Sequence, residues 1–275
     1  MDIDEKYNSL KKILHSFGNV IIAYSGGVDS TFLLKAAVNT LGIEHVLPCI
    51  GISGSLAQSQ YQIALASAKD IGLTVHQVNL SEIGDAKYSA NKANRCFHCK
   101  SHLFSALNEL AAEKGIEHIL CGSNFDDKDD YRPGNRAAEA FKVRAPLLDA
   151  EMTKQDIRHL SRMLGLRTAD MPASPCLASR IAYGLEVTEE NLKQVELSED
   201  FLRSMGFVEF RVRHHGNMAR IEVGEGDFEK ISHHRKKISS RLKKIGFKFV
   251  AMDLEGFRSG RLNEALTEEQ KKKNI

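Results

Sequence analysis

The stretch "VIIAYSGGVDSTFLLKAA", Val20 to Ala37, decides the fold of the N-terminal part of the chain. Its first five residues, Val20 to Tyr24, form the apolar run of a buried strand, and residues 30–41 have the pattern of a helix. A serine and two glycines join the two elements. Glycines allow backbone N–H groups to approach an anion closely, and the start of the helix adds partial positive charge. The stretch therefore predicts a strand, an anion-binding turn and a helix.

The chemistry of this turn is indicated by Asp29 and by a missing lysine. A carboxylate beside phosphates would repel them, so the expected role of Asp29 is to hold Mg²⁺, which prefers oxygen ligands. A Walker A loop ends in Gly-Lys followed by Ser or Thr, and this chain has no Gly-Lys pair. The sequence "SGGVDS" resembles instead the PP-loop of ATP pyrophosphatases, which bind pyrophosphate and transfer AMP to an acceptor oxygen. The residues expected to contact ATP are Ala23, Ser25, Gly26, Gly27, Val28, Asp29 and Ser30.

A further nucleotide contact is expected at Ser53, in "GISGS" after the next strand. Ligands of open parallel sheets bind at the carboxyl ends of the strands, so Ser53 would meet the adenine or the ribose. An ordinary turn between a strand and a helix explains the same residues equally well. The sequence leaves both interpretations open.

Strand and helix patterns alternate through the first half of the chain. Pro48, inside the second expected strand, suggests that this strand is irregular. The alternation predicts an α/β fold of PP-loop type, a parallel sheet with helices on both faces. The expected strands are 20–24, 45–50, 74–80 and 118–122, and the expected helices are 5–16, 30–41, 58–71 and 99–114.

The pattern changes in the second half. A helix opened by Thr153 is followed by 168–184, which contains two prolines and no periodicity. Two alternating strands joined by a short turn then predict a small C-terminal α+β domain. The elements expected there are helix 189–205, strands 207–215 and 218–223, helix 227–245 and strand 247–254. We expect a PP-loop ATP pyrophosphatase domain at 1–168, a cysteine-bearing loop and linker at 169–186, and a substrate-binding or oligomerisation domain at 187–275.

Composition excludes some classes of protein. The chain has 275 residues, is 42% hydrophobic and carries a net charge of +2, which suits a globular protein with a sizeable core. No apolar run is long enough to span a membrane, and the N-terminus lacks the apolar centre of a signal peptide. We therefore expect a cytoplasmic protein without a membrane partner. The basic residues at 233–244 are more typical of a solvated helix face than of a nucleic-acid surface.

Two of the five cysteines are expected to be structural, and an odd number cannot all pair internally. Cys49 and Cys121 end apolar strands, where cysteine behaves as a small hydrophobic residue. Cys96 and Cys99 form a C-x-x-C pair, but the second pair that a structural zinc site usually needs is missing.

Cys176 is the candidate nucleophile. It lies in a loop of small residues, and the guanidinium of Arg180 would lower the pKa of its thiol and favour the thiolate. Cys96, Cys99 and Cys176 could together hold a [4Fe–4S] cluster with one open iron. In the alternative, Cys176 is free and the C-x-x-C is a redox pair or ordinary packing.

Candidate substrate contacts follow the fourth strand and lie in the second domain. Asn124 and Arg132 are expected on the same rim as the PP-loop, where arginine can bind a carboxylate or phosphate, although exposed loops often have this composition. Arg211 and Arg213 alternate along one strand and share a face, so they could grip one phosphate or simply be solvated. Weaker candidates are Arg136, Arg144, Arg258 and Arg261, with Glu199 and Asp227 for a metal or subunit contact.

Six segments together resemble the LarE-type sulfurtransferases over nearly the full chain: "YSGGVDS", "GSNFDDKDDYRPG", "VRAPLLDAEMTKQDIR", "PASPCLASRI", "RVRHHGNMARIEV" and "GFRSGRLN". These PP-loop enzymes act in making the nickel-pincer cofactor of lactate racemase. The resemblance implies that ATP adenylates a carboxylate of a pyridinium biscarboxylate mononucleotide, with release of pyrophosphate. A sulfur nucleophile then displaces AMP and leaves a thiocarboxylate.

The resemblance implies two versions of the sulfur donor. In sacrificial members the cysteine that matches Cys176 gives up its own sulfur and becomes dehydroalanine. In cluster-bearing members three cysteines hold [4Fe–4S], and a sulfide on the open iron is transferred. The extra cysteines of "CFHC" favour the second version. Catalytic roles fall to Cys176, Asp29 and Arg180, with ATP and Mg²⁺ as cofactors, a sulfide donor, and a homo-oligomeric assembly.

Three rival functions share parts of this pattern. A tRNA-thiolating PP-loop enzyme would usually carry an RNA-binding domain or zinc-binding cysteine pairs, and the near-neutral charge offers little attraction to nucleic acid. An ammonia-using ligase resembling NAD or GMP synthetase would not need Cys176. A nucleotide-binding regulatory module would retain its function in cells without this thiol.

Overall fold

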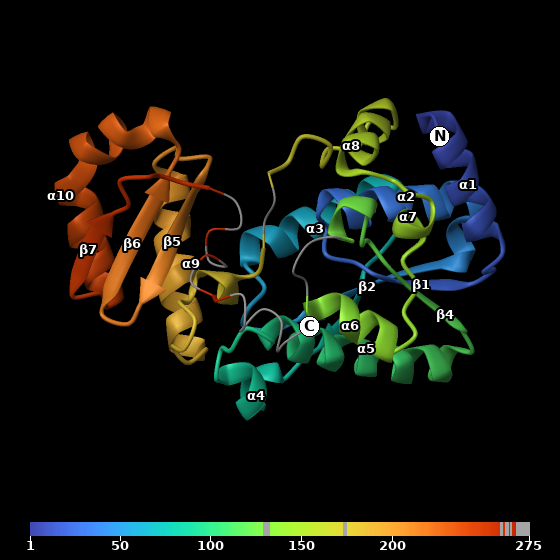
Figure 1. Ribbon diagram of the computed structural model, residues 1–275, viewed down its shortest axis with the longest axis horizontal. Helices are drawn as coiled ribbons and strands as arrows, with labels where there is room; N and C mark the ends of the chain where they lie inside the picture. Colours follow the sequence, from blue (N-terminus) through green and yellow to red (C-terminus); the bar gives the residue numbers. More distant parts are fainter. Residues whose placement is uncertain (129–132, 173–174, 259–260, 262–263, 265, 268–275) are drawn as a thin grey trace. The chain divides into compact units, whose positions relative to one another are not determined.

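The computed structural model describes residues 1–128, 133–172, 175–258, 261, 264, 266 and 267 (Figure 1). The chain forms two compact units. The first contains Met1–Glu82 and Cys96–Ser174, and the second contains Ile83–Arg95 and the chain from Pro175. The elements of the first unit are α1 (Ile3–His15), β1 (Val20–Ala23), α2 (Val28–Leu41), β2 (Val46–Ile52), α3 (Gln58–Ile71), β3 (His76–Asn79), α5 (Arg95–Lys114), β4 (His118–Cys121), α6 (Pro133–Ala140), α7 (Pro146–Asp149) and α8 (Lys154–Met163). Those of the second unit are α4 (Ala86–Ser89), α9 (Glu189–Ser204), β5 (Phe210–His215), β6 (Met218–Val223), α10 (Phe228–Ile245) and β7 (Phe249–Met252).

The first unit is built on a four-stranded sheet in the order β3-β2-β1-β4, in which every neighbouring pair is parallel. Val20 of β1 lies opposite Val46 of β2 and opposite His118 of β4. Helices α1, α2, α3, α7 and α8 contribute to the core on one face, and α5 and α6 to the core on the other (Figure 1). The expected α/β fold, a parallel sheet with helices on both faces, is confirmed.

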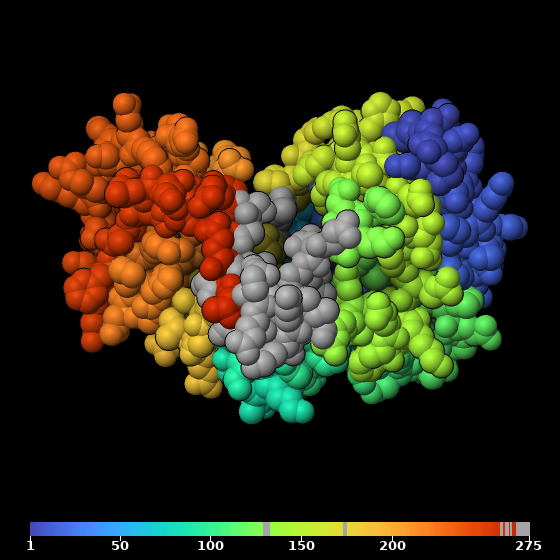
Figure 2. Space-filling view, viewed as in Figure 1, coloured from blue at the N-terminus to red at the C-terminus, as the bar shows by residue number. Residues whose placement is uncertain are grey.

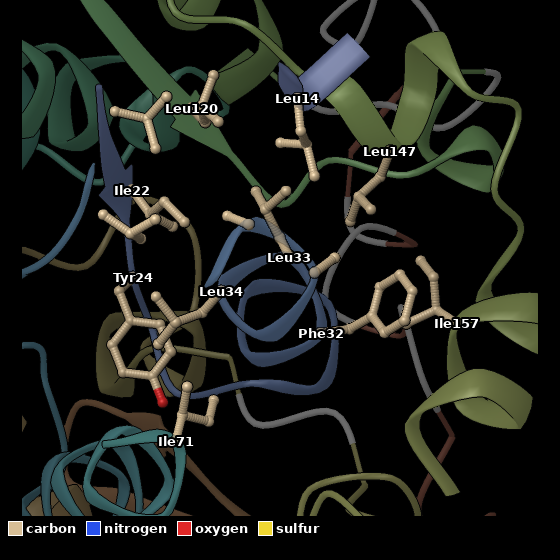
Figure 3. Close-up of a cluster of buried hydrophobic side chains, with 14 of the residues drawn as sticks. Leu14, Ile22, Tyr24, Phe32, Leu33, Leu34, Ile71, Leu120, Leu147 and Ile157 are labelled. Carbon is tan, nitrogen blue, oxygen red and sulfur yellow. The ribbon is translucent and has the colours of Figure 1, made fainter. Parts of the chain in front are cut away.

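Two hydrophobic cores lie on opposite faces of this sheet. Val20 and Ile22 belong to one and Ile21 to the other, because successive side chains of a strand point to opposite faces. Figure 3 shows the first core, which gathers side chains of β1, α1, α2, α7 and α8. Cys49 and Cys121 lie in the second core as expected, and burial raises the pKa of the Cys49 thiol to about 12.

Strand β2 is regular despite Pro48, contrary to the expectation. Alternate residues of a parallel strand bond to opposite neighbours. The carbonyl of Ile52 accepts the N–H of Leu80, just after β3, at 2.9 Å, so the even-numbered residues of β2 face β3. The first pair of these strands is Cys49 with His76. Pro48 lies before that pair, so its missing N–H removes no ladder hydrogen bond.

The second unit contains the expected hairpin and a third strand. β5 pairs antiparallel with β6, from Phe210 opposite Val223 to His215 opposite Met218. β7 joins β6 in parallel. Apolar side chains of α9, α10 and the three strands form one core. The small C-terminal α+β fold predicted from the sequence is therefore present.

The second unit also includes Ile83–Arg95, an excursion from the first half of the chain. Asn91 is fully buried and has a positive φ of 50°. Its side-chain amide donates to the carbonyls of Ile181, Ala182 and Leu185 at 3.3, 2.9 and 2.9 Å. The domain boundaries at 168 and 186 stay a prediction. Each compact unit is built from segments of the chain that are interrupted by a segment of the other unit.

Helix α10 carries the basic cluster of the sequence. Its apolar stripe, Ile231, Ile238 and Leu242, is buried in the core, while Lys236, Lys237 and the other basic side chains of 235–244 are partly or fully exposed. Figure 2 shows the orange residues of α10 at the surface of the second unit. Among the described residues, no helix combines the length and the hydrophobicity that crossing a membrane requires.

His214 makes the stability of the second unit depend on pH. Its Nδ1 accepts the N–H of Gly216 at 3.2 Å, so the other ring nitrogen carries the proton and donates to Gln194 at 2.9 Å. Burial lowers the pKa of His214 below its usual 6.5, and repulsion by His215 lowers it further, against an opposing attraction from Glu190. The unfolded state therefore binds a proton first as pH falls.

We expect the stability of the second unit to be complete above pH 6.5 and to be lost as pH falls through the folded pKa of His214. The free energy of unfolding at pH 7.5, 6.5 and 5.5 is measured by urea titration followed by circular dichroism, since the chain has no tryptophan. His214→Gln should flatten the slope. An equal slope in His214→Gln and the unmodified protein would contradict the assignment. The exposed His233→Gln serves as the control.

Candidate active site

Residues 24–27 form a tight turn between β1 and α2, after Ala23. The hydroxyl of Ser30 accepts the N–H of Ser25 at 3.3 Å, and the two serine hydroxyl oxygens lie 3.0 Å apart. The Ser30 hydroxyl also donates to the carbonyl of Gly27 at 3.3 Å. These bonds hold the loop closed around the first turn of α2.

The start of α2 offers backbone donors. Its first intrahelical bond runs from the N–H of Thr31 to the carbonyl of Gly27 at 3.0 Å. The N–H groups of residues 28–30 therefore have no intrahelical acceptor, and the helix dipole adds positive charge at the same place. This geometry suits an anion such as a phosphate.

Two glycines allow other elements to approach this loop closely. Gly26 has a φ of 71°, and a Cβ there would lie 2.4 Å from the Cβ of Ala64 in α3. A Cβ on Gly122, after β4, would lie 3.0 Å from the backbone nitrogen of Ser30. The loop is therefore enclosed by α3 on one side and by the end of β4 on another.

Asp29 has one oxygen occupied and one without a partner. Its Oδ2 accepts a hydrogen bond from the ammonium of Lys154 at 2.5 Å. Its Oδ1 is buried, and no other described residue donates to it. A buried carboxylate oxygen without a donor calls for an explanation, and a bound Mg²⁺ supplies one because this ion prefers oxygen ligands. The donor chemistry at Asp29 thus fits the expected magnesium.

Lys154 lies beside the PP-loop, and no sequence pattern indicates this position. It lies 125 residues after Asp29 and begins α8. Thr153 caps that helix, with Asp156 completing the capping box, and the N–H of Lys154 donates to Asp126 at 2.8 Å. The capping box was visible in the sequence. Its position beside the PP-loop was not, because that position depends on the sheet order.

Arg180 organises the loop of Cys176. The thiol is exposed, and the guanidinium of Arg180 donates to the backbone carbonyls of Pro175 and Cys176. Glu199 of α9 accepts two further hydrogen bonds from this arginine, at 2.9 and 3.1 Å. Arg180 thus contacts Cys176 through the backbone carbonyl, and the catalytic role of this arginine stays a prediction.

Residues of the excursion hold the other side of the Cys176 loop. Arg95 is buried and donates to the carbonyl of Ala178 at 2.8 Å and to the side chain of Asn91 at 2.5 Å. The ring of Tyr183 lies 6.0 Å from the same guanidinium. No sequence pattern indicates this role of Arg95 and Asn91, because both lie more than 80 residues before the loop that they support.

Arg211 and Arg213 have different surroundings. Arg213 is buried, donates twice to Glu222, at 3.0 and 2.8 Å, and donates once to the carbonyl of Ser179 at 3.0 Å. Arg211 lies over the ring of Phe257 at 4.8 Å. Burial lowers the pKa of Arg211 to about 10, and the positive charges of Arg180 and Arg213 contribute. Arg211 also donates to the backbone carbonyl of Phe210 at 2.6 Å, and its role as a substrate contact stays a prediction.

Comparisons with known proteins cover almost the whole chain. Residues 3–112 match the NAD synthase family model. An uncharacterised protein of Synechocystis sp. is 38% identical, over 96% of this chain and 99% of that protein. The pyridinium-3,5-bisthiocarboxylic acid mononucleotide synthase of Lactiplantibacillus plantarum is 35% identical, over 96% of each.

The chain belongs to the LarE family. A protein of Methanocaldococcus jannaschii, 34% identical over 87% of this chain, covers most of the same residues. The resemblance noted in the sequence is thus confirmed, and the chain is an ATP-using sulfurtransferase of the PP-loop type.

The LarE-type candidates divide between the two units. The first holds the ATP-binding set, with Ser53 after β2 and Asn124 buried after β4. The second holds Cys176, Arg180, Arg211 and Arg213, while Arg132 lies outside the described residues. Of the weaker candidates, Glu199 pairs with Arg180, Arg258 with Glu255 and Arg261 with Asp253, and Asp227 precedes α10.

The three candidate cluster cysteines have the donor chemistry of an iron–sulfur site. Cys96 is exposed and Cys99 half-buried, and the two lie one turn apart at the start of α5, on the same side of that helix. Cys176 belongs to the other unit. Among the described residues, no three His, Cys, Asp or Glu side chains come together as a metal site. Their use as cluster ligands is therefore a proposal.

Proposed function

We propose that this LarE-family protein transfers sulfur, at the expense of ATP, to a carboxylate of a pyridinium biscarboxylate mononucleotide. The product is a thiocarboxylate for the nickel-pincer cofactor of lactate racemase. The L. plantarum relative, a pyridinium-3,5-bisthiocarboxylic acid mononucleotide synthase, supports this substrate. The observation that carries the proposal is the PP-loop with a buried oxygen on Asp29 that has no partner among the described residues, in a chain that also presents the exposed thiol of Cys176.

The first step is adenylation. A carboxylate oxygen of the substrate attacks the α-phosphorus of ATP, and the bond from that phosphorus to the departing pyrophosphate breaks. The N–H groups of residues 28–30 and the ammonium of Lys154 offset the charge of the pyrophosphate. Mg²⁺ held by Asp29 would supply further positive charge. Lys154 thereby takes the place of the lysine that the loop itself lacks.

The second step is displacement. A sulfur nucleophile attacks the acyl carbon, the bond from that carbon to the AMP oxygen breaks, and AMP leaves with the electron pair. Adenylation makes this possible because AMP is a much better leaving group than oxide. Arg211 would hold the substrate phosphate, since an anion offsets the repulsion that this arginine feels from Arg180 and Arg213.

For the sulfur donor we propose the cluster version. Cys96, Cys99 and Cys176 would hold a [4Fe–4S] cluster, and the chemistry that such a cluster would supply is a sulfide for transfer. In the sacrificial alternative the Cys176 thiolate attacks the adenylate, and the Cα proton and the Cβ–Sγ bond are then lost, leaving dehydroalanine. The odd number of free thiols suits a reducing cytoplasm.

The test begins with anaerobic purification and analysis for iron and sulfide. The protein is then given ATP, Mg²⁺, sulfide and the pyridinium biscarboxylate mononucleotide. We expect AMP, pyrophosphate and thiocarboxylate in equal amounts, iron in the protein and an unchanged intact mass. ADP with orthophosphate would overturn the adenylation.

The same experiment separates the alternatives. An iron-free protein that loses one sulfur and two hydrogens would assign the donor to Cys176 and overturn the cluster version. An amide formed with ammonium, and no thiocarboxylate with sulfide, would indicate ligase chemistry like that of the NH3-dependent NAD(+) synthetase of Pelodictyon phaeoclathratiforme, which is 27% identical over 32% of this chain.

A further inference from the structure

Glu82 is a buried carboxylate that the proposed reaction does not use. It lies after β3, in the short turn Glu82–Gly84, and its exposed fraction is zero. Its Oε1 accepts the hydroxyl of Ser55 at 2.9 Å. Its Oε2 is buried without a hydrogen-bond partner among the described residues. Burying a carboxylate is costly. The one hydrogen bond that Glu82 accepts among the described residues comes from Ser55, which indicates that the orientation of the Ser55 hydroxyl matters.

The Ser55 hydroxyl, which donates its proton to Glu82, in turn fixes the orientation of the Ser53 hydroxyl. The two hydroxyl oxygens lie 3.0 Å apart, and the N–H of Ser55 donates to the Ser53 hydroxyl oxygen at 3.3 Å. A serine hydroxyl has one proton and two acceptor lone pairs. The proton of Ser55 is directed to Glu82, so the bond between the serines must be donated by Ser53.

The consequence is that Ser53 has its proton turned inward. Its oxygen can then offer only a lone pair to a ligand. This holds whether or not Oε2 of Glu82 carries a proton, because Oε1 accepts in both states. Glu82, Ser55 and Ser53 thus form a hydrogen-bonded relay. Ser53 is half-exposed whereas Ser55 is 2% exposed, so Ser53 is the serine of this relay that is available to a ligand.

The relay lies on the rim of the nucleotide site. β1 and β2 are parallel neighbours, so the PP-loop and the Ser53 turn leave the sheet at the same edge. The helix that follows the Ser53 turn is α3, and its Gln60 donates to the carbonyl of Ser25 in the PP-loop at 3.0 Å. A nucleotide whose phosphates occupy the loop would extend along this edge.

We propose that Glu82 and Ser55 fix Ser53 as a hydrogen-bond acceptor for a donor group of the nucleoside of ATP. The inference rests on the proposed use of ATP and adds a positioning role for Glu82. Two groups of adenosine have the required chemistry, the 6-amino group of the base and the ribose hydroxyls.

The test measures binding by calorimetry with Mg²⁺ and ATP, purine riboside triphosphate, 2′-deoxy-ATP or 3′-deoxy-ATP, without the pyridine substrate. We expect Ser53→Ala and Ser55→Ala to weaken ATP binding by about fivefold, the usual effect of one lost hydrogen bond. The analogue that lacks the bonded donor should bind equally to the unmodified protein and to Ser53→Ala. If purine riboside triphosphate binds the two proteins equally, the donor that Ser53 contacts is the 6-amino group. If a deoxy analogue binds them equally, the donor is the ribose hydroxyl that this analogue lacks.

Glu82 is tested by two replacements and a control. Glu82→Gln keeps an acceptor for Ser55 and should bind ATP within twofold of the unmodified protein, whereas Glu82→Leu should behave as Ser55→Ala does. Ser59→Ala, in the first turn of α3, is the matched serine control and should change nothing. Circular dichroism identifies any variant that fails to fold. If Glu82→Leu fails to fold, Ser55→Ala still decides the test.

Unchanged ATP binding in Ser55→Ala, or equal losses with every analogue, would overturn the relay. The outcome is independent of the reaction. A protein that shows the expected binding but forms no AMP would overturn the proposed function and leave the relay standing. A protein that makes thiocarboxylate while Ser55→Ala binds ATP normally would overturn the relay alone.

Discussion

Cys176→Ala is expected to abolish thiocarboxylate formation, by roughly 10³-fold or more, as replacement of an essential nucleophile does. The loss follows in either version of the donor, because the thiol is a cluster ligand in one and the sulfur source in the other. Adenylation should survive, since the PP-loop, Asp29 and Lys154 all belong to the other compact unit. Substrate-dependent exchange of labelled pyrophosphate into ATP measures this first step alone.

The matched control is Cys121→Ala. This thiol is buried at the end of β4 and has no part in the proposed chemistry, so thiocarboxylate formation should persist. Retention of full sulfur transfer by Cys176→Ala would exclude the thiol from the reaction. Loss of pyrophosphate exchange together with sulfur transfer would show that the replacement acts on the first step.

Gly26→Ala is expected to destabilise the first unit by about 3 kcal/mol and to remove ATP binding. Two causes add. The φ of 71° is a left-handed conformation that alanine adopts at a cost, and the new Cβ would lie 2.4 Å from the Cβ of Ala64. Relief requires that α3 move away from the PP-loop, which opens the anion site. Urea unfolding and calorimetry with Mg²⁺ and ATP measure the two effects.

Gly27→Ala is the control on the neighbouring residue. Gly27 has an ordinary φ of −79°, and its added Cβ would meet only the Ser25 hydroxyl at 3.4 Å. Its cost should be about 1 kcal/mol, the value for alanine at a helix N-cap. Equal destabilisation by both replacements would contradict the role given to the close approach of α3.

Local sequence patterns were sufficient to predict the helices and strands whose apolar residues form one continuous buried surface. The apolar run of β1 and the helix pattern of α2 predicted the elements around the PP-loop, and the alternating hairpin predicted β5 and β6. The sequence patterns predict no helix at α6, whose eight residues follow a charged segment. Its buried face consists mainly of small residues such as Ala137 and Ala138, which give little periodic signal.

The site shows a sharper limit. The residues of the PP-loop are contiguous, so their spacing carried their chemistry. Lys154 approaches Asp29 only because the chain crosses the sheet between them, and no local pattern records that approach. From its spacing, Arg180 was expected beside the thiol of Cys176. A buried guanidinium needs oxygen acceptors, and Arg180 donates to the carbonyls of Pro175 and Cys176 and to the carboxylate of Glu199. The spacing alone does not indicate these acceptors.

The excursion Ile83–Arg95 has a practical consequence for dissecting the molecule. Up to residue 258, the chain passes between the compact units three times, after residues 82, 95 and 174. No single cut can therefore release either unit intact. A C-terminal fragment that starts at Pro175 would lack the amide of Asn91 and the guanidinium of Arg95, leaving carbonyls of the cysteine loop without their donors. Gene fusions and fragment complementation should carry residues 83–95 with the C-terminal part, for example as a circular permutant.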